Sequence, residues 1–285
     1  MEFRALASPA GAVQSAQGID VSNFQGNYDW GHAKASVPGL AFGIFRLTQG
    51  LGGAGRNSPD PFAAHNHGAI AAQGLVRGAY HFLDPALDGA AQASYFVTQY
   101  GKLGLTGTDM LWLDNETGSN PAQVAACGRS FMAELDKLAP HNPRGVYTFI
   151  SFARDGHNAG LGGYPLWLAF PALAAPAPPP PWHNWTFWQW GQRNGADVDA
   201  YNGTAAQLHA WIASFAPKPA GPFRHVADGT QSLAQIARAR NTTVEHLIAV
   251  TMQAIRPEDV TAALVHLLEL NAPLPSGTVW YSTNP

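Results

Sequence analysis

MLWLDNE, residues 110–116, is a short apolar run that ends in two acidic residues, and its composition is typical of a buried β-strand. Successive side chains of a strand point to opposite faces. Trp112, Asp114 and Glu116 are therefore predicted on one face, and Leu111 and Leu113 on the other. The segment predicts a strand that packs on both sides and carries two carboxylates over one cavity at its carboxyl end.

The two acids of this segment form a pair with a defined chemistry. Their alpha carbons are expected roughly 6 to 7 Å apart, and each charge disfavours ionisation of the other. Trp112 raises the pKa further by desolvation. One acid can then keep its proton near neutral pH beside a negative neighbour, which is what cleavage of a glycosidic bond requires. A helix cap or a surface pair is the structural alternative for the same motif.

Seven further segments on both sides of this one have strand composition. They are QGIDVS from Gln17, LAFGIFRLT from Leu40, VRGAYHF from Val76, RGVYTFIS from Arg144, PLWLAF from Pro165, WTFWQW from Trp185 and DVDAY from Asp197. Helices are predicted near 57–73, over 88–100, and from Asn120, where an N-cap is followed by a first-turn proline. About eight strands with fewer helices predict an α/β fold, an irregular TIM-like β/α barrel with a largely parallel sheet.

Functional residues of such barrels collect at the carboxyl ends of the strands. This rule brings together four acids from distant parts of the chain, namely Asp20, Asp114, Glu116 and Asp199. Burying four carboxylates for structure alone would cost several kcal/mol. Arg46 is the obvious cationic partner on a neighbouring strand. We therefore interpret the acids as a functional site.

Aromatic side chains occur on the same strands, where alternate residues can face the site. They are Tyr80, Phe82, Tyr147, Trp167, Trp188 and Trp190. Sugar rings have apolar faces that stack on such side chains. Core packing is the alternative for each of them, because aromatic residues supply much of the buried area of any barrel.

The overall composition excludes several classes of partner. With 46% hydrophobic and 12% charged residues among 285, the chain can bury a large core. A net charge of −3 and a pI near 6.4 provide no basic stripe for nucleic acid or an anionic membrane. His65 and His67 are expected on different faces of a helix, so we expect no metal site there and no cofactor.

Eight ordered motifs resemble glycoside hydrolase family 25, the peptidoglycan muramidases common among phage endolysins. The motifs are GIDVSNFQG, FRLTQG, RGAYHF, WLDNE, VYTF, LWLA, FWQW and VDAYNGT, from about Gly18 to Phe215. The resemblance implies an irregular β/α barrel that cleaves the β-1,4 bond between N-acetylmuramic acid and N-acetylglucosamine with retention. Bacterial peptidoglycan is then the expected partner, and we expect a monomer.

The resemblance also implies roles for single residues. Glu116 resembles the general acid and Asp114 its charged neighbour, with Asp20 and Asp199 as flanking acids. The sugar contacts expected on the same strands are Tyr80, Phe82, Trp167, Trp188 and Gln189. Direct attack by Asp114 and participation of the substrate's acetamido group both stay open, and the resemblance favours the second.

The composition changes after Phe215, where APKPAGP is suited to an extended spacer. The predicted organisation is an N-terminal tail at 1–17, the barrel at 18–215, a linker at 216–222 and a second domain at 223–285.

The second domain resembles the LysM peptidoglycan-binding module. Its expected elements are a turn and helix at 228–236, a second helix at 243–250 and a closing strand at 279–282. An inserted segment, 251–268, carries its own helical pattern. A small helical domain for dimerisation is the alternative.

Two other functions stay open beside the muramidase. A chitinase-type glycosidase would carry a longer acidic run, where Trp112 stands here, and the intact acids argue against a catalytically dead sugar-binding protein. Residues 1–17 contain no apolar run of signal-peptide length. We therefore expect a phage lysin that stays in the host cytoplasm until release and then acts on the cell wall. A bacterial toxin delivered by another system fits as well.

Overall fold

The computed structural model describes residues 15–53, 58–193, 195–217, 223–227, 229–254, 273, 274, 276 and 278–282. The chain divides into two compact units, Met1–Ala216 and Pro217–Pro285. None of the helices among the described residues combines the length and the apolar composition that a membrane-spanning helix needs.

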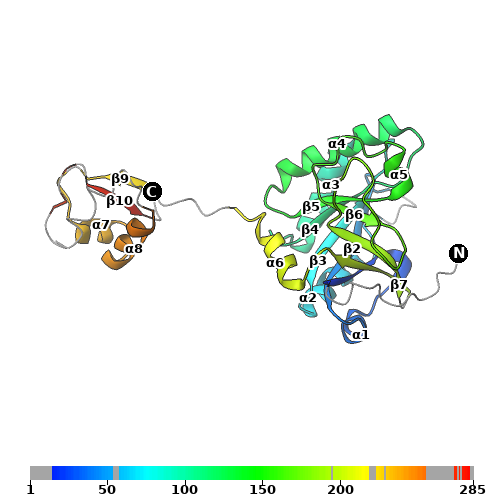
Figure 1. Cartoon of the computed structure of the whole chain (residues 1–285), viewed down its shortest axis with the longest axis horizontal. Helices are drawn as coiled ribbons and strands as arrows, with labels where there is room; N and C mark the ends of the chain where they lie inside the picture. The colour runs from blue at the N-terminus through cyan, green and yellow to red at the C-terminus, as the bar shows by residue number, and fades with distance from the viewer. Residues whose placement is uncertain are drawn as a thin grey trace. The chain divides into compact units, whose positions relative to one another are not determined.

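The first unit is a closed eight-stranded barrel in which the strands follow one another in chain order (Figure 1). The strands are β1 (Gln17–Val21), β2 (Leu40–Gln49), β3 (Val76–Phe82), β4 (Met110–Asp114), β5 (Arg144–Phe149), β6 (Leu166–Ala169), β7 (Phe187–Arg193) and β8 (Ala196–Tyr201). Neighbours from β1 to β7 are parallel, whereas β8 is antiparallel to both β7 and β1. The predicted irregular α/β barrel is confirmed. Because β8 runs in reverse, its first residues lie where the other strands end.

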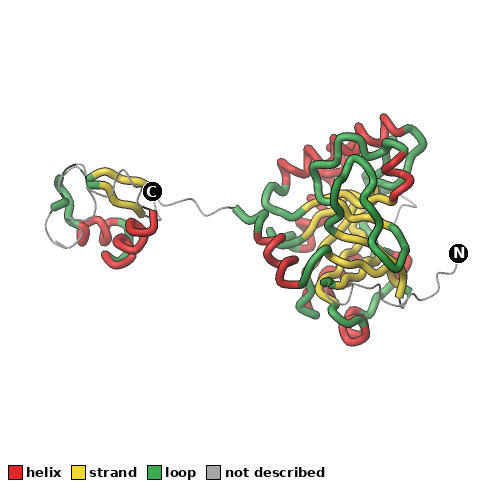
Figure 2. Tube along the Cα trace, in the orientation of Figure 1, coloured by secondary structure: helices red, strands yellow, loops and turns green. Residues whose placement is uncertain are grey.

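Helices surround the strands of this unit (Figure 2). They are α1 (Trp30–Ser36), α2 (Ala63–Ala72), α3 (Gly89–Leu103), α4 (Pro121–Leu138), α5 (Ile150–Arg154) and α6 (Ala205–Ala213), with a 3₁₀-helix η1 (Asn23–Gln25) after β1. The predicted cap of α4 is present, since the Asn120 side chain accepts from the N–H of Gln123 and Pro121 opens the helix. The prediction contains no counterpart of α1, α5 and α6, because seven, five and nine residues give little helical periodicity. Ile150 and Ser151, predicted as the end of a strand, open α5 instead.

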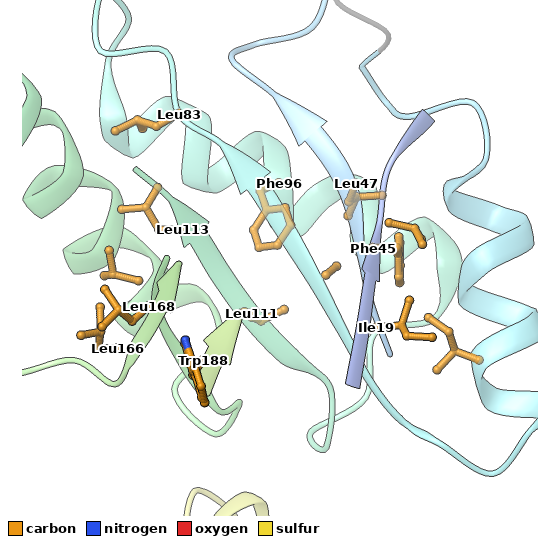
Figure 3. Close-up of a cluster of buried hydrophobic side chains, with 14 of the residues drawn as sticks. Ile19, Phe45, Leu47, Leu83, Phe96, Leu111, Leu113, Leu166, Leu168 and Trp188 are labelled. Carbon is orange, nitrogen blue, oxygen red and sulfur yellow. The ribbon is translucent and has the colours of Figure 1, made fainter. Parts of the chain in front are cut away.

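Strand alternation divides the buried side chains into two layers. Leu111 and Leu113 of β4 point outward and pack with residues of other strands and of α3, among them Phe96 (Figure 3). Trp112 points into the barrel, where its ring lies 5.0 Å from that of Phe187. The face assignment predicted for residues 111–113 is thus confirmed, and the inner aromatic layer closes the barrel beneath the acids.

The described residues of the second unit form a two-stranded antiparallel sheet and two helices. Its elements are β9 (Phe223–Val226), α7 (Leu233–Ala239), α8 (Val244–Ala254) and β10 (Val279–Ser282), with β9 and β10 paired. Its core gathers around Leu233, Ile236, Leu247 and Trp280. Most of the predicted insertion at 251–268 lies outside the described residues, as do residue 228, the linker residues 218–222 and most of the predicted tail.

Candidate active site

A cavity of about 180 Å³ opens at the end of the barrel where the parallel strands finish. Its described lining comes from all eight strands and the loops that follow them: Asp20, Ser22, Phe24, Gln25, Arg46, Tyr80, Phe82, Asp114, Glu116, Tyr147, Trp167, Gln189 and Asp197. Four carboxyl groups and one guanidinium thus share a small space. The structure brings together the predicted acids Asp20, Asp114 and Glu116, as well as four of the five predicted sugar contacts.

Asp114 and Glu116 line the same wall of the cavity, the first as the last residue of β4 and the second two positions further on. Burial raises the pKa of Asp114 well above its usual value; the charge of Glu116 raises it further, and Arg46 lowers it. Burial also raises the pKa of Glu116, with a contribution from Asp197. Both shifts favour protonation relative to an exposed carboxyl group, and the fold by itself does not single out Glu116 as the acid that holds the proton.

Glu116 lies beyond the end of its strand, and the residues on either side of it are anchored. The side-chain amide of Asn115 donates to Oδ1 of Asn158 at 2.9 Å, and Asn158 donates in turn to Oγ1 of Thr148 at 3.0 Å. Both asparagines are fully buried. On the other side, the Thr117 hydroxyl donates at 3.2 Å to the backbone carbonyl of the residue that follows β3. These bonds fix the residues on either side of Glu116, whose side chain lines the cavity together with Asp114.

Asp20 and Asp197 lie opposite each other in the register of β1 and β8. The Gln189 amide donates to Oδ2 of Asp20 at 2.7 Å, and its Oε1 accepts from the Tyr147 hydroxyl at 3.0 Å. Burial raises the pKa of Asp20 well above its usual value, and the neighbouring acids raise it further. The amide therefore links two walls of the cavity and orients one of its acids.

Asp199 differs from its predicted place, because β8 is antiparallel. The start of β8, not its end, lies at the cavity, so Asp197 lines it and Asp199 lies one step deeper, fully buried. One oxygen of Asp199 accepts from Nε1 of Trp167 at 2.8 Å. Burial raises the pKa of Asp199 to about 8. The sequence reasoning missed Asp197, although the Asp-x-Asp spacing of DVDAY places both acids on one face.

Of the predicted sugar contacts, Tyr80, Phe82, Trp167 and Gln189 line the cavity, and Trp188 does not. Trp188 belongs to the buried cluster on the outer face of the strands (Figure 3), where its Nε1 donates to the Phe170 carbonyl at 2.8 Å. The reason is strand alternation, because adjacent residues of β7 cannot both face inward. Since Gln189 faces the cavity, the expectation for Trp188 is wrong.

Arg46 is the one cationic side chain among the described lining residues. Its guanidinium pairs with the buried Asp60 at 3.1 Å and donates to Oδ1 of Asn23. Because Asp60 already matches this positive charge, the four lining carboxyl groups have no cation to themselves. An acid excess of this kind at the end of a barrel is typical of a catalytic site.

A β/α barrel whose strand ends carry paired carboxyl groups within an aromatic-lined cavity defines the class of glycoside hydrolases. The model of glycosyl hydrolases family 25 matches residues 19–199. This chain therefore belongs to glycosyl hydrolases family 25, and it is a glycoside hydrolase.

Individual relatives agree with this assignment. Lysozyme M1 of Streptomyces globisporus is 30% identical over 218 residues, which cover 70% of this chain and 71% of that protein. The bacterial lysozyme from Streptomyces coelicolor has a similar structure, with a TM-score of 0.62 and 29% identity over 71% of this chain and 99% of the other. A muramidase from Acremonium alcalophilum gives a TM-score of 0.61 and 26% identity over 70% and 99%.

Proposed function

We propose that this protein is an N-acetylmuramidase that cleaves the β-1,4 bond between N-acetylmuramic acid and N-acetylglucosamine in bacterial peptidoglycan. The observation that carries the proposal is the pair of Asp114 and Glu116 in the aromatic-lined cavity of a family 25 barrel. The similarity to proteins named lysozyme and muramidase supports the choice of substrate.

In the proposed mechanism, Glu116 donates its proton to the glycosidic oxygen as the bond to the anomeric carbon breaks, and later takes a proton from the attacking water. Burial raises the pKa of both carboxyl groups, which favours retention of a proton by the pair. Positive charge that develops at the anomeric carbon stabilises the ionised form of Asp114, and Arg46 acts in the same direction. The remaining proton is then held by Glu116.

We further propose retention through the substrate's own acetamido group. Its oxygen forms a bond to the anomeric carbon as the leaving oxygen departs, and Asp114 stabilises the resulting positive charge. Water then attacks the anomeric carbon from the face that the leaving oxygen vacated, opposite the acetamido oxygen. The bond to the acetamido oxygen breaks as Glu116 takes a proton from the water, so the two displacements together give retention. The position of the two acids two residues apart along one wall supports the short carboxyl separation that retention requires.

The test is the release of reducing ends from purified peptidoglycan, followed by mass analysis of the new end. A muramidase leaves N-acetylmuramic acid at this end. Glu116→Gln should abolish release while the melting temperature stays nearly unchanged, because the amide keeps the shape of the carboxyl group. New ends on N-acetylglucosamine, activity on chitin instead of cell wall, or no release at all would each contradict the proposal.

For the second unit we propose binding to peptidoglycan as a LysM-like module. The order strand, helix, helix, strand, with the two strands paired, supports it. The full chain carrying Glu116→Gln should sediment with insoluble cell walls, and the same chain ended after Ala216 should sediment far less. Hydrolysis of soluble glycan by the shortened chain with Glu116 restored serves as the check on its folding. Equal sedimentation of the two chains would contradict a binding role.

We also propose that the protein acts as a phage lysin, released from the host cytoplasm before it reaches the wall. Expression inside a bacterial host should leave cells intact until a membrane-permeabilising holin is co-expressed. Lysis without the holin would contradict this, and would favour a protein exported by another route.

A further inference from the structure

Phe24 differs from the other aromatic residues of the cavity in its exposure to solvent. It lines the cavity, yet 84% of its surface is exposed, whereas no other large hydrophobic residue described exceeds 55%. Tyr80, Tyr147 and Trp167 are by contrast packed against the inner aromatic layer. A single exposed apolar residue is unremarkable on a protein surface. At the mouth of an acid-rich cavity, however, it offers the face of its ring to whatever enters.

The backbone that carries this ring is fixed from several sides. Phe24 is the middle residue of η1, whose capping box joins Ser22 and Gln25. The N–H of Asn23 donates to Oδ2 of Asp60 at 2.7 Å, and Gln25 Nε2 donates to the Gly195 carbonyl at 3.4 Å, in the turn between β7 and β8. The ring is therefore presented by an ordered segment, and little entropy has to be lost when a ligand binds to it.

Arg46 adds to this arrangement. Its guanidinium carbon lies 5.9 Å from the centroid of the Phe24 ring, within the range of a cation–π contact. The same guanidinium is held by Asp60. Arg46 thus contacts the Phe24 ring and also lowers the pKa of Asp114. Most of the ring surface stays exposed.

We propose that Phe24 is a stacking platform for a pyranose ring of the glycan strand, adjacent to the sugar whose bond is cut. This inference rests on the proposed function. A cavity of about 180 Å³ is too small for more than part of a polymeric substrate, so neighbouring sugars must lie at its rim. The C–H face of a pyranose is apolar and suits an aromatic ring, whereas its hydroxyl edge suits the surrounding polar groups.

The experiment compares kcat and KM on soluble peptidoglycan glycan fragments for the wild type, Phe24→Ala and Phe24→Trp. Loss of one stacking contact should raise KM about tenfold, with kcat within about twofold, because the platform binds substrate and transition state equally. Phe24→Trp should keep the wild-type KM. The matched control is Leu138→Ala, which removes a 42% exposed side chain at the end of α4, outside the cavity lining.

Melting temperatures should be unchanged in both Phe24 variants, because 84% of the Phe24 surface is exposed. An unchanged KM in Phe24→Ala, or a fall in kcat at constant KM, would overturn the inference. Failure of the proposed function has a separate signature, since the wild type itself would then release no reducing ends. In that case the same fragments are titrated into the Glu116→Gln protein and into the double variant that also carries Phe24→Ala. A tenfold difference in Kd between the two proteins supports the inference, and equal Kd values contradict it.

Discussion

The two ends of the barrel differ in how the charges of their carboxyl groups are compensated. At the cavity end, four lining acids face one arginine that is already paired with Asp60. At the other end, Asp109 lies directly before β4 and accepts two bonds from the Arg77 guanidinium, at 2.8 and 2.9 Å. The Thr106 N–H also donates to Asp109, at 2.7 Å. The cavity end therefore has more carboxyl groups than cations. At the opposite end, each carboxylate oxygen of Asp109 accepts a hydrogen bond from Arg77.

This difference separates stability from chemistry. In a matched pair each charge compensates the other, so removal of one partner leaves an uncompensated charge and destabilises the fold. Unmatched acids raise one another's pKa and hold protons that a reaction can use, at a cost to the fold. Changes to carboxyl groups should thus reduce activity at the cavity end and stability at the opposite end.

After Glu116→Gln, the largest effect is expected for Asp114→Asn at the cavity end. The rate of reducing-end release should fall about 1,000-fold, because the developing positive charge loses its anionic partner. The melting temperature should stay the same or rise, since a buried acid with a raised pKa is removed. The control is Asp155→Asn, an exposed acid after α5. A rate near that of the wild type would make Asp114 a structural residue.

Asp109→Asn is the counterpart at the opposite end. It leaves the partly buried Arg77 guanidinium without its anion, so the free energy of unfolding should fall by about 3 kcal/mol. Activity per folded molecule should not change. Urea unfolding gives the first quantity, and Glu134→Gln is the control, since its exposed pair with Lys137 is worth about 0.5 kcal/mol or less. The comparison between the two ends breaks down if Asp109→Asn loses no more stability than this control.

The strands that form these two ends could be predicted from sequence because alternation is a local signal. The order apolar, acid, polar, acid in residues 113–116 was sufficient to place Asp114 and Glu116 on the inward face. The direction of β8 was not predictable in this way, since a period of two is the same in both directions along a strand. For this reason Asp199 was expected at the cavity, whereas Asp197 lines it.

Other parts of the site depend on contacts between distant segments. Asn115 and Asn158 are 43 residues apart, and neither has a neighbour in sequence that indicates a buried amide pair. Trp188 and Gln189 were both expected to face inward, although strand alternation permits only one of them to do so. Gln189 faces the cavity, and Trp188 is buried on the outer face of β7. Sequence patterns therefore located the acids of the cavity better than the groups that support them.

Asn158→Ala tests one of these supporting groups at the cavity end. Loss of its bonds frees the segment that carries Glu116, so kcat should fall about tenfold with KM unchanged, as for misplacement of a catalytic group. Stability should also fall, by about 1–2 kcal/mol. Asn66→Ala is the matched control, because Asn66 is fully buried, accepts from Trp30 at 2.9 Å and lies outside the cavity lining. Equal kcat values for the two variants would give Asn158 a purely structural role.

The smallest effect is expected for Asp199→Asn, in the pH dependence of stability. The pKa of Asp199 is about 8 in the fold, against about 3.9 in an unfolded chain. Between these values the folded protein binds more protons than the unfolded one, so the free energy of unfolding falls as pH rises.

The variant cannot ionise at this position, and its amide oxygen can still accept from Trp167. Its decline in stability between pH 5 and pH 8 should therefore be smaller than that of the wild type, by on the order of 1–2 kcal/mol. Urea unfolding of both proteins at the two pH values measures this difference. If the free energy of unfolding declines equally with pH in both proteins, acids other than Asp199 carry the uncompensated charge of the cavity end. The contrast between the two ends would then rest on the residues that line the cavity.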